Sequence, residues 1–290
     1  MSATSIELRD FQFQGNGNKP PTNWRKGNQI GCGGFSNVYR AEIDMQGQTH
    51  AIAVKVIKVS QNEKDTKKKK SVVAEIKALK KFQHERIVSY YGFLELEFKS
   101  FIFMEYIEEG SLRKYMSTNG RLNIDMIKHF TRQILQGVQY LHGLKCVHRD
   151  IKPENVLIKS QNIKLTDFGL ARFFDEITKT YTAFTGTIRY MAPEVFEKGK
   201  SNSKSVDIWA TGCVVLEMTT GDIPFSKIQQ FPLQGLMSRD NLTPLDKQYL
   251  DAELPKETEN FLSKIFTFDA KKRPTASILL KDTFLNGKNK

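Results

Sequence analysis

The chain has 290 residues, of which 39% are hydrophobic and 26% charged, a composition typical of a globular protein with one large domain or two modest lobes. Its three widely spaced cysteines argue against a disulfide framework and a C-x-x-C zinc site, and no apolar stretch approaches the roughly 20 residues that cross a bilayer. The formal net charge is +12, and much of the excess lies in lysines 64 and 67–70. We therefore expect a cytoplasmic protein without a membrane span.

The lysine run has two interpretations. A cationic surface attracts nucleic acid, anionic membranes or acidic partners. Alternatively, the run is the solvated flank of a helix or loop. The absence of aromatic residues within it favours the second interpretation, so no nucleic-acid partner is expected.

Residues 1–23 end in glycines, asparagines and prolines, which predicts a flexible N-terminal arm. A glycine-rich stretch follows, IGCGGFSNVY (30–39), with three glycines in four positions and Ser36 where a G-x-G-x-x-G pattern has its last glycine. Taken alone, this stretch is a mononucleotide loop, a dinucleotide loop or only a flexible turn.

The stretch HAIAVKVIKV (50–59) predicts a strand, and its alternation places Ala53 and Lys55 on one face. An unpaired ammonium flanked by apolar residues is costly, so Lys55 needs a partner. The following KKSVVAEIKALKKF (69–82) has helical spacing with Glu75 on its apolar face. Two interpretations are open at this point: Lys55 pairs with Glu75, or the two side chains are unrelated and each extends its charged end to solvent.

Beyond Gly110 the pattern becomes helical. Residues 123–144 carry an apolar stripe, and residues 205–221 are apolar nearly all round, which predicts a buried central helix. A strand-rich part followed by a helix-rich part indicates two lobes, with the crossing near 104–110.

Two motifs lie between these helices, HRDIKPENVLI (148–158) and IKLTDFGLARF (163–173), and A-P-E follows at 192–194. With the earlier V-K strand, they make the chain resemble the eukaryotic protein kinases over about residues 24–285. The resemblance implies an α+β, bilobal kinase fold. Its small lobe (about 24–104) has a five-stranded antiparallel sheet and one helix, and a hinge (about 105–109), a mainly helical lobe (about 110–285) and a C-terminal tail (286–290) follow.

The resemblance also implies catalytic roles. Asp150 accepts the proton of the substrate hydroxyl, and Lys152 steadies the transferred phosphate; a lysine there resembles the serine/threonine branch. Asn155 and Asp167 supply oxygen ligands for Mg²⁺. Lys55 holds the α- and β-phosphates of ATP.

The remaining implied contacts concern pairing and the nucleotide. Glu75 holds Lys55. Ala53 lies against the adenine, with Val38 above and Leu157 below. Met104 is the gatekeeper before Glu105 and Ile107, whose backbone groups meet the adenine edge. A strand-like NVYRAEI after the glycines favours a hairpin over ATP rather than a dinucleotide loop. The loop contacts are Ile30, Gly31, Cys32, Gly33, Gly34, Phe35, Ser36, Asn37 and Val38.

Residues 167–194 match the activation segment. Thr182 and Thr185 are the candidate sites of activating phosphorylation, by an upstream kinase or by autophosphorylation, and Thr187 is expected in the substrate groove. Arg149 is the natural cation for a phosphate on this segment.

Three further residues match structural positions of the family. Glu194 and Arg273 match an ion pair that fastens the segment to the lower lobe. Asp207 matches an aspartate that braces the catalytic loop.

Subfamily features resemble the MAP kinase kinase kinases of the MEKK type, chiefly Tyr-Tyr-Gly at 90–92 and Gly-Ser-Leu at 110–112. This implies a MAP kinase kinase as the protein substrate. A Ste20-type kinase with other substrates and a pseudokinase scaffold are the alternatives. The presence of the full catalytic set favours an active enzyme.

Overall fold

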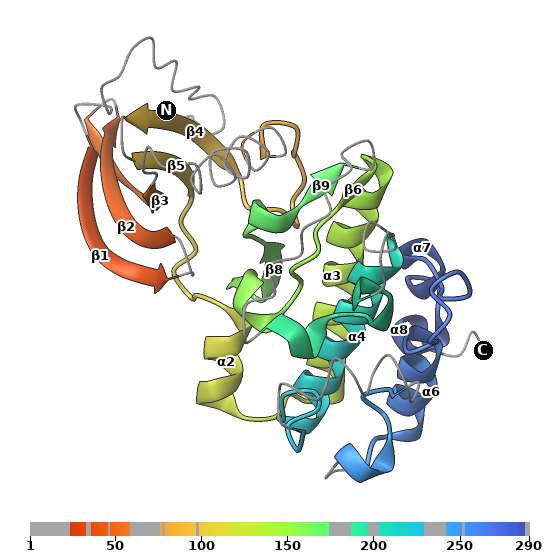
Figure 1. Ribbon diagram of the computed structural model, residues 1–290. Coiled ribbons are helices and arrows are strands. Elements are labelled where there is room, and N and C mark those ends of the chain that lie inside the picture. Colours follow the sequence, from red (N-terminus) through yellow and green to blue (C-terminus); the bar gives the residue numbers. More distant parts are fainter. Residues whose placement is uncertain are drawn as a thin grey trace. The chain divides into compact units, whose positions relative to one another are not determined.

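The computed structural model describes residues 24–32, 36–45, 47–58, 76, 79–96, 99–173, 187–196, 203–228, 242–250 and 253–287. The chain divides into two compact units, and the division falls after Glu108 (Figure 1). Within the described residues, no helix combines the length and the apolarity that crossing a membrane requires.

The first unit is built on one antiparallel sheet with strand order β1-β2-β3-β5-β4. This confirms the expected five-stranded sheet. The glycine-rich stretch joins β1 to its antiparallel neighbour β2, as a hairpin requires, although residues 33–35 lie outside the described part. The strands are β1 (Trp24–Cys32), β2 (Ser36–Met45), β3 (Gln48–Lys58), β4 (Tyr90–Leu96) and β5 (Lys99–Glu105).

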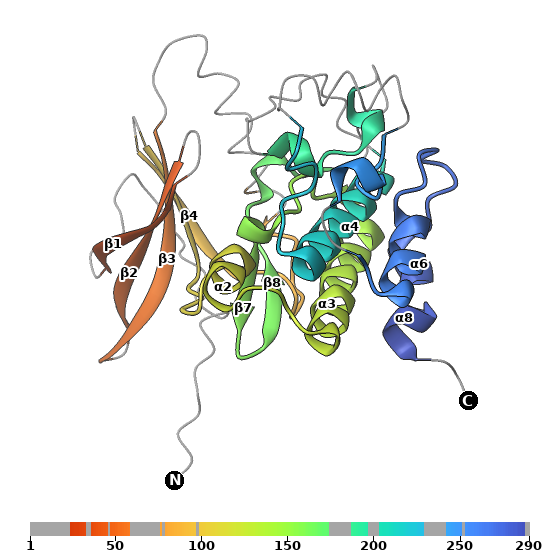
Figure 2. The same ribbon diagram turned by 90° about the horizontal axis from the view of Figure 1, so that it is seen from below.

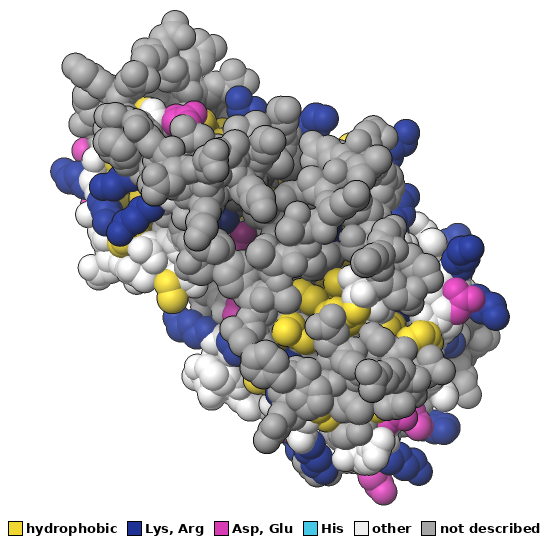
Figure 3. Space-filling model, viewed as in Figure 1, with side chains coloured by type: hydrophobic (Ala, Val, Ile, Leu, Met, Phe, Trp, Pro, Cys, Tyr) yellow, Lys and Arg dark blue, Asp and Glu magenta, His cyan; other side chains and the backbone are white. Residues whose placement is uncertain are grey.

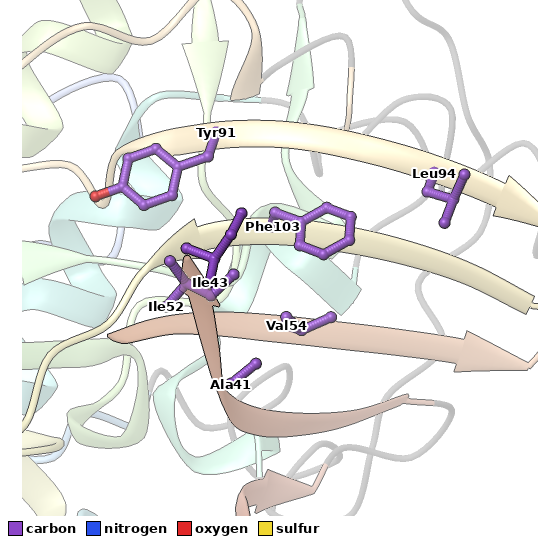
Figure 4. Packing of buried hydrophobic residues seen from close by; sticks show 7 residues of the cluster. All are labelled: Ala41, Ile43, Ile52, Val54, Tyr91, Leu94 and Phe103. Atoms are coloured by element: carbon purple, nitrogen blue, oxygen red, sulfur yellow. The ribbon is translucent and has the colours of Figure 1, made fainter. Parts of the chain in front are cut away.

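One face of this sheet carries the apolar core of the first unit (Figure 4). Strand β3 contributes Ile52 and Val54, both fully buried, as the alternation of its sequence predicts. Trp24 packs edge-on against Phe103, with ring centroids 5.6 Å apart. The cluster consists of Ala41, Ile43, Ile52, Val54, Tyr91, Leu94 and Phe103.

The helix expected over 69–82 falls mostly outside the described residues, and Glu75 with it. Ile76 and Leu79 are helical and buried, and the amide of Lys80 donates to the carbonyl of Ile76 at 3.0 Å. The described residues thus agree with a helix there, while the pairing of Glu75 stays a prediction.

The second unit is organised around α3 (Ile124–Gly143) and α4 (Ser205–Thr220), which pack against each other (Figure 2). Both helices were expected from the sequence. Helix α3 begins at an Asn123 cap and buries one stripe, whereas α4 is buried along almost its whole length. Helix α4 stops at Gly221, whose left-handed backbone (φ +81°) suits glycine.

Short elements connect and flank these helices. Strand β6 pairs with β9, and β7 pairs with β8, all antiparallel. The label η marks a 3₁₀ turn. The short elements are α2 (Leu112–Asn119), β6 (Cys146–Val147), η2 (Pro153–Asn155), β7 (Val156–Lys159), β8 (Asn162–Leu165), η3 (Phe168–Leu170), β9 (Arg172–Phe173), η4 (Thr187–Tyr190), η5 (Pro193–Phe196) and η6 (Lys247–Tyr249).

Near its C-terminal end, the described part of the second unit has the helices α6 (Lys256–Ile265), α7 (Ala276–Leu279) and α8 (Thr283–Asn286). Helix α8 includes Asn286, one residue beyond the expected end of the domain. The Asn286 side-chain amide donates to the carbonyls of Leu280 and Asp282 at 2.9 and 3.0 Å, which fixes the residue to the helical turn.

Lysine and arginine side chains of the described residues occur on both units in the view of Figure 3. The lysine run at 64 and 67–70 lies outside the described residues. Its expected role as a solvated flank therefore stays a prediction.

Candidate active site

The carboxylate of Asp150 lies in the loop between β6 and β7 and is 7% exposed. The ammonium of Lys152 donates to both of its oxygens, at 3.0 Å (Oδ1) and 2.9 Å (Oδ2). The amide of Asn155 donates to Oδ2 and to the main-chain carbonyl of Asp150, each at 2.8 Å. The structure thus brings Lys152, predicted as catalytic, and Asn155, predicted as a metal ligand, together on the carboxylate of Asp150.

Asp207, fully buried in the first turn of α4, holds the start of this loop. Its carboxylate accepts the backbone amides of His148 at 2.9 Å and Arg149 at 2.8 Å. The ring of His142 donates to the same carboxylate at 2.8 Å. Burial alone raises the pKa of Asp207, but the hydrogen bond from His142 and the other donors outweigh burial and lower this pKa below its usual value.

The charge state of Asp150 reflects opposing influences. Burial raises its pKa, the ammonium of Lys152 lowers it, and the negative charge of Asp167 raises it again; the net shift is upward. Asp167 has a left-handed backbone (φ 62°), uncommon for a residue other than glycine, and its Oδ1 accepts the amide of Gly169 at 3.3 Å. The negative charges of Asp167 and Asp150 therefore repel each other, and the two carboxylates form one acidic site.

Asn155 and Asp167 offer a donor set for a divalent metal. Both hydrogen bonds of Asn155 described above use its amide nitrogen, which orients that side of the amide toward Asp150 and leaves the carbonyl oxygen for other contacts. Hard oxygen donors beside two mutually repelling carboxylates suit Mg²⁺ or a similar ion. Within the described ranges, no cluster of three or more His, Cys, Asp or Glu side chains forms a metal site made of protein groups alone.

In the first unit, the predicted nucleotide residues Val38, Ala53, Lys55 and Met104 share the sheet face opposite the apolar cluster, whereas Glu105 pairs with Ile52 of that cluster. Val38 pairs with Lys55, and Ala53 pairs with Met104. Lys55 is 7% exposed. In the adjoining stretch, Ile30 and Cys32 are exposed and Ser36 and Asn37 begin β2, whereas Gly33, Gly34 and Phe35 lie outside the described residues.

Three residues predicted to contact the adenine, Glu105, Ile107 and Leu157, can be described within their own units. The amide of Glu105 donates to the carbonyl of Ser89 at 2.9 Å. We therefore expect Glu105 to contact the adenine through its carbonyl. Ile107 is buried. In the second unit, Leu157 lies in β7 and forms a β-bridge with Ser111.

The activation segment is described only at its two ends. Thr182 and Thr185 lie outside the described residues, and Thr187 is the first residue of η4. At the far end, the guanidinium of Arg273 donates to both oxygens of Glu194, at 2.6 and 3.2 Å, with both side chains buried.

The sequence pattern does not predict a second, partly buried network beside the catalytic loop. The guanidinium of Arg113 (α2) donates to Glu154 at 2.8 Å, to the Tyr190 hydroxyl at 2.6 Å and to Glu217. The Tyr190 hydroxyl donates to Glu217 at 2.6 Å. Burial raises the pKa of Glu217, and Tyr190 and Arg113 oppose that shift. Glu217, one of two carboxylates in the mostly apolar stretch 205–221, was the signal available.

Comparison with known proteins adds an independent observation. A family model described as "Protein kinase domain" matches residues 24–285. Mitogen-activated protein kinase kinase kinase A of Dictyostelium discoideum is 35% identical over 90% of this chain and 28% of its own length. Mitogen-activated protein kinase kinase kinase 3 of Homo sapiens is 36% identical over 91% of this chain and 42% of its own length. The chain thus spans less than half of each of these relatives.

Proposed function

The chain belongs to the protein kinase family, and we propose that it transfers the γ-phosphate of ATP to serine or threonine hydroxyls of a MAP kinase kinase. The observation that carries this proposal is the convergence of Lys152 and Asn155 on the buried carboxylate of Asp150. Phosphoryl transfer needs a positioned hydroxyl and neutralised charge more than covalent help. A carboxylate held at both oxygens is suited to orient the hydroxyl and to accept its proton.

Lys152 has two tasks in this proposal. In the present arrangement its ammonium lies on Asp150 and opposes the rise in the pKa of that carboxyl. A cation at this position also stabilises negative charge that builds up on the transferred group. Lys152 therefore keeps the base ionised and supports the developing charge.

We assign Mg²⁺ to Asn155 and Asp167, because their oxygen donors and the surplus negative charge near Asp150 fit a hard divalent cation. Bound there, the ion neutralises phosphate charge. Asn155 is held in place by its two bonds to Asp150, and Asp167 by its bond to the amide of Gly169.

We assign ATP to the first-unit residues on the Lys55 face and to the glycine-rich hairpin, with Leu157 of β7 as a further adenine contact. A Cβ added at Gly31 would meet Val38 at 3.7 Å, an ordinary contact, so the fold itself does not demand glycine there. A ligand that needs close backbone approach gives a reason for it. In this assignment Lys55 holds the phosphates, and Glu75 holds Lys55.

Activation is assigned to phosphorylation of Thr182 or Thr185, by an upstream kinase or by the chain itself. Arg149, beside the catalytic Asp150, is the proposed cation for that phosphate because guanidinium binds phosphate oxygens in pairs. Thr187 is assigned to the substrate groove. We further propose that the protein acts in the cytoplasm.

The relatives named as MAP kinase kinase kinases support the substrate assignment over a Ste20-like enzyme. The sequence contains the complete set of Lys55, Glu75, Asp150, Asn155 and Asp167, which supports an enzyme over a pseudokinase scaffold.

The test is incubation of the chain with Mg²⁺, ATP and a panel of kinase-dead MAP kinase kinases, with Asp150→Asn and Lys55→Met as controls. We expect transfer by the wild type alone and unchanged thermal stability of Lys55→Met. Transfer no greater than that of Asp150→Asn would refute the enzyme, and transfer only to unrelated proteins would refute the substrate class.

A further inference from the structure

Tyr190, at the C-terminal end of the turn η4 (Thr187–Tyr190), lies close to Asp150. Tyr190 and the following Met191 line a shallow hollow together with Arg149 and Asp150. The turn is closed by a hydrogen bond from the amide of Met191 to the carbonyl of Ile188 at 3.1 Å. Any polypeptide that brings a hydroxyl to Asp150 comes close to this turn.

Arg113 fastens the C-terminal end of η4 to the catalytic loop. Its one planar guanidinium reaches Tyr190, Glu217 and Glu154 at the same time. Glu154 belongs to η2 and directly precedes Asn155, so the contact joins the turn to the loop that carries the catalytic residues. The fixed fork of donors makes arginine suited to three acceptors, which a lysine ammonium serves less well.

Arg189 fastens η4 on another side. Its guanidinium donates to the carbonyls of Ile228 at 2.8 Å, Pro224 at 3.4 Å and Phe225. Phe225 is 2% exposed and has a left-handed backbone (φ 57°), a conformation that persists only where the surroundings impose it. The carbonyl of Arg189 in turn accepts the thiol of buried Cys213 at 3.8 Å.

Arg113 of α2 and Arg189 of η4 itself therefore both hold this four-residue turn in place. Hydrogen bonds from charged donors are stronger than neutral ones, and the acceptors lie on the catalytic loop, on α4 and on the turn after α4. Of the two, Arg113 reaches the catalytic loop, through Glu154, and so ties that loop to the turn at Tyr190.

We propose that Arg113 and Arg189 are positioning residues that hold η4 beside Asp150 as a preset platform for the protein substrate, an inference that rests on the proposed function. The platform aligns the acceptor hydroxyl and makes no contact with ATP. Misplacement of a reacting group by about 1 Å costs up to about 100-fold in rate. Loss of either arginine should therefore reduce use of the protein substrate and spare use of ATP.

The experiment compares Arg113→Met and Arg189→Met with Arg132→Met. Arg132 of α3 makes the same kinds of bonds, to a side chain and a carbonyl, but at Asn286 and Leu285. We expect kcat/KM for a kinase-dead MAP kinase kinase to fall about 10- to 100-fold in the first two variants. The KM for ATP should stay within about twofold, and Arg132→Met should match the wild type.

Amide hydrogen exchange gives a readout that needs no activity. We expect the Met191 amide to exchange at least about tenfold faster in Arg113→Met and Arg189→Met, and at the wild-type rate in Arg132→Met. Wild-type exchange at Met191 in both test variants would overturn the proposal that the two arginines hold η4 in place. Absence of transfer by the wild-type chain would instead overturn the proposed function, so the two failures are distinguishable.

The double variant tests whether both arginines act on the same turn. If one loss already releases η4, the second has less to remove, so the fall in kcat/KM should be clearly smaller than the product of the single effects. A fall in kcat/KM equal to the product of the two single effects would overturn the proposal that both arginines hold the same turn.

Chemical rescue tests the role of charge and planarity at position 113. The Arg113 side chain is 30% exposed, so a small cation can reach its place. Millimolar guanidinium should restore several-fold activity to Arg113→Ala, whereas neutral urea at the same concentration should not. An equal response to both solutes would contradict the proposal.

Discussion

The carboxylate of Asp207 accepts the backbone amide of Arg149 at 2.8 Å, at a residue whose own backbone is left-handed (φ 70°). Such a conformation costs about 1–3 kcal/mol for a residue other than glycine and needs support from its surroundings. The orientation of the adjoining Asp150 depends on this backbone conformation of Arg149. One buried side chain of α4 thus maintains the strained peptide that precedes Asp150, the proposed catalytic base.

Asp207→Asn should lower the free energy of unfolding by about 2–3 kcal/mol. The amide can still accept from one backbone N–H, but its NH₂ group faces the other donor, and the charge that attracts both is lost. Urea denaturation measures the change, and Asp222→Asn at an exposed position is the matched control. A loss below about 0.5 kcal/mol, as at ordinary surface sites, would show that Asp207 does not carry the loop.

The contribution of Asp207 should also depend on pH. Its pKa in the folded chain is lower than the usual value of 3.8, so the unfolded chain binds this proton more readily. The stability it contributes is therefore present above about pH 4 and is lost as pH falls through the folded pKa. The difference in unfolding free energy between wild type and Asp207→Asn should shrink on acidification from pH 6 to about pH 3. A difference that grows on acidification would contradict this assignment.

The buried pair of Glu194 and Arg273 predicts a strong asymmetry between single and double substitutions. Arg273→Met should cost about 3–5 kcal/mol, because it leaves the Glu194 carboxylate buried without its cation. Adding Glu194→Gln should recover part of the loss, since the uncompensated charge is gone. Thermal or urea unfolding of the four proteins of this cycle measures the coupling; strictly additive losses would argue against it. Lys256→Met, in an exposed pair with Glu259, should change stability by less than about 1 kcal/mol.

Gly212 in the middle of α4 predicts a steric effect. A Cβ there would lie 2.4 Å from Cγ2 of Ile265 and 3.1 Å from the Phe266 ring, so Gly212→Ala should destabilise the chain by about 1–3 kcal/mol. Gly143→Ala is the control, because a Cβ at the last residue of α3 meets nothing within 4 Å. That change should be neutral or stabilise by up to about 1 kcal/mol. Similar melting temperatures for the two variants would contradict the tight packing of α4 against α6.

Sequence reasoning located the elements whose signals are local. The alternation in β3 and the apolar stripe of α3 are visible in short windows, and the catalytic loop follows a motif that places Asp150, Lys152 and Asn155 within six residues. These elements appear where the sequence indicated them.

The networks around η4 could not be predicted in the same way. Arg113 and Glu217 are 104 residues apart and meet only because α2 and α4 are brought together by the fold. Arg189 binds main-chain carbonyls, which have no side-chain signature. The left-handed backbone of Phe225 could not be predicted either: Gly221 and Pro224 indicate a turn, but the left-handed residue itself is a phenylalanine.

The three cysteines differ sharply in their surroundings. Cys146 and Cys213 are buried, and burial raises the pKa of the Cys213 thiol well above its usual range, whereas Cys32 at the end of β1 is exposed. A thiol-reactive dye added to the native chain should therefore attach at a single position, beside the glycine-rich hairpin. The chain thus contains its own site for a fluorescent reporter, and nucleotide titrations can be followed without engineering a cysteine.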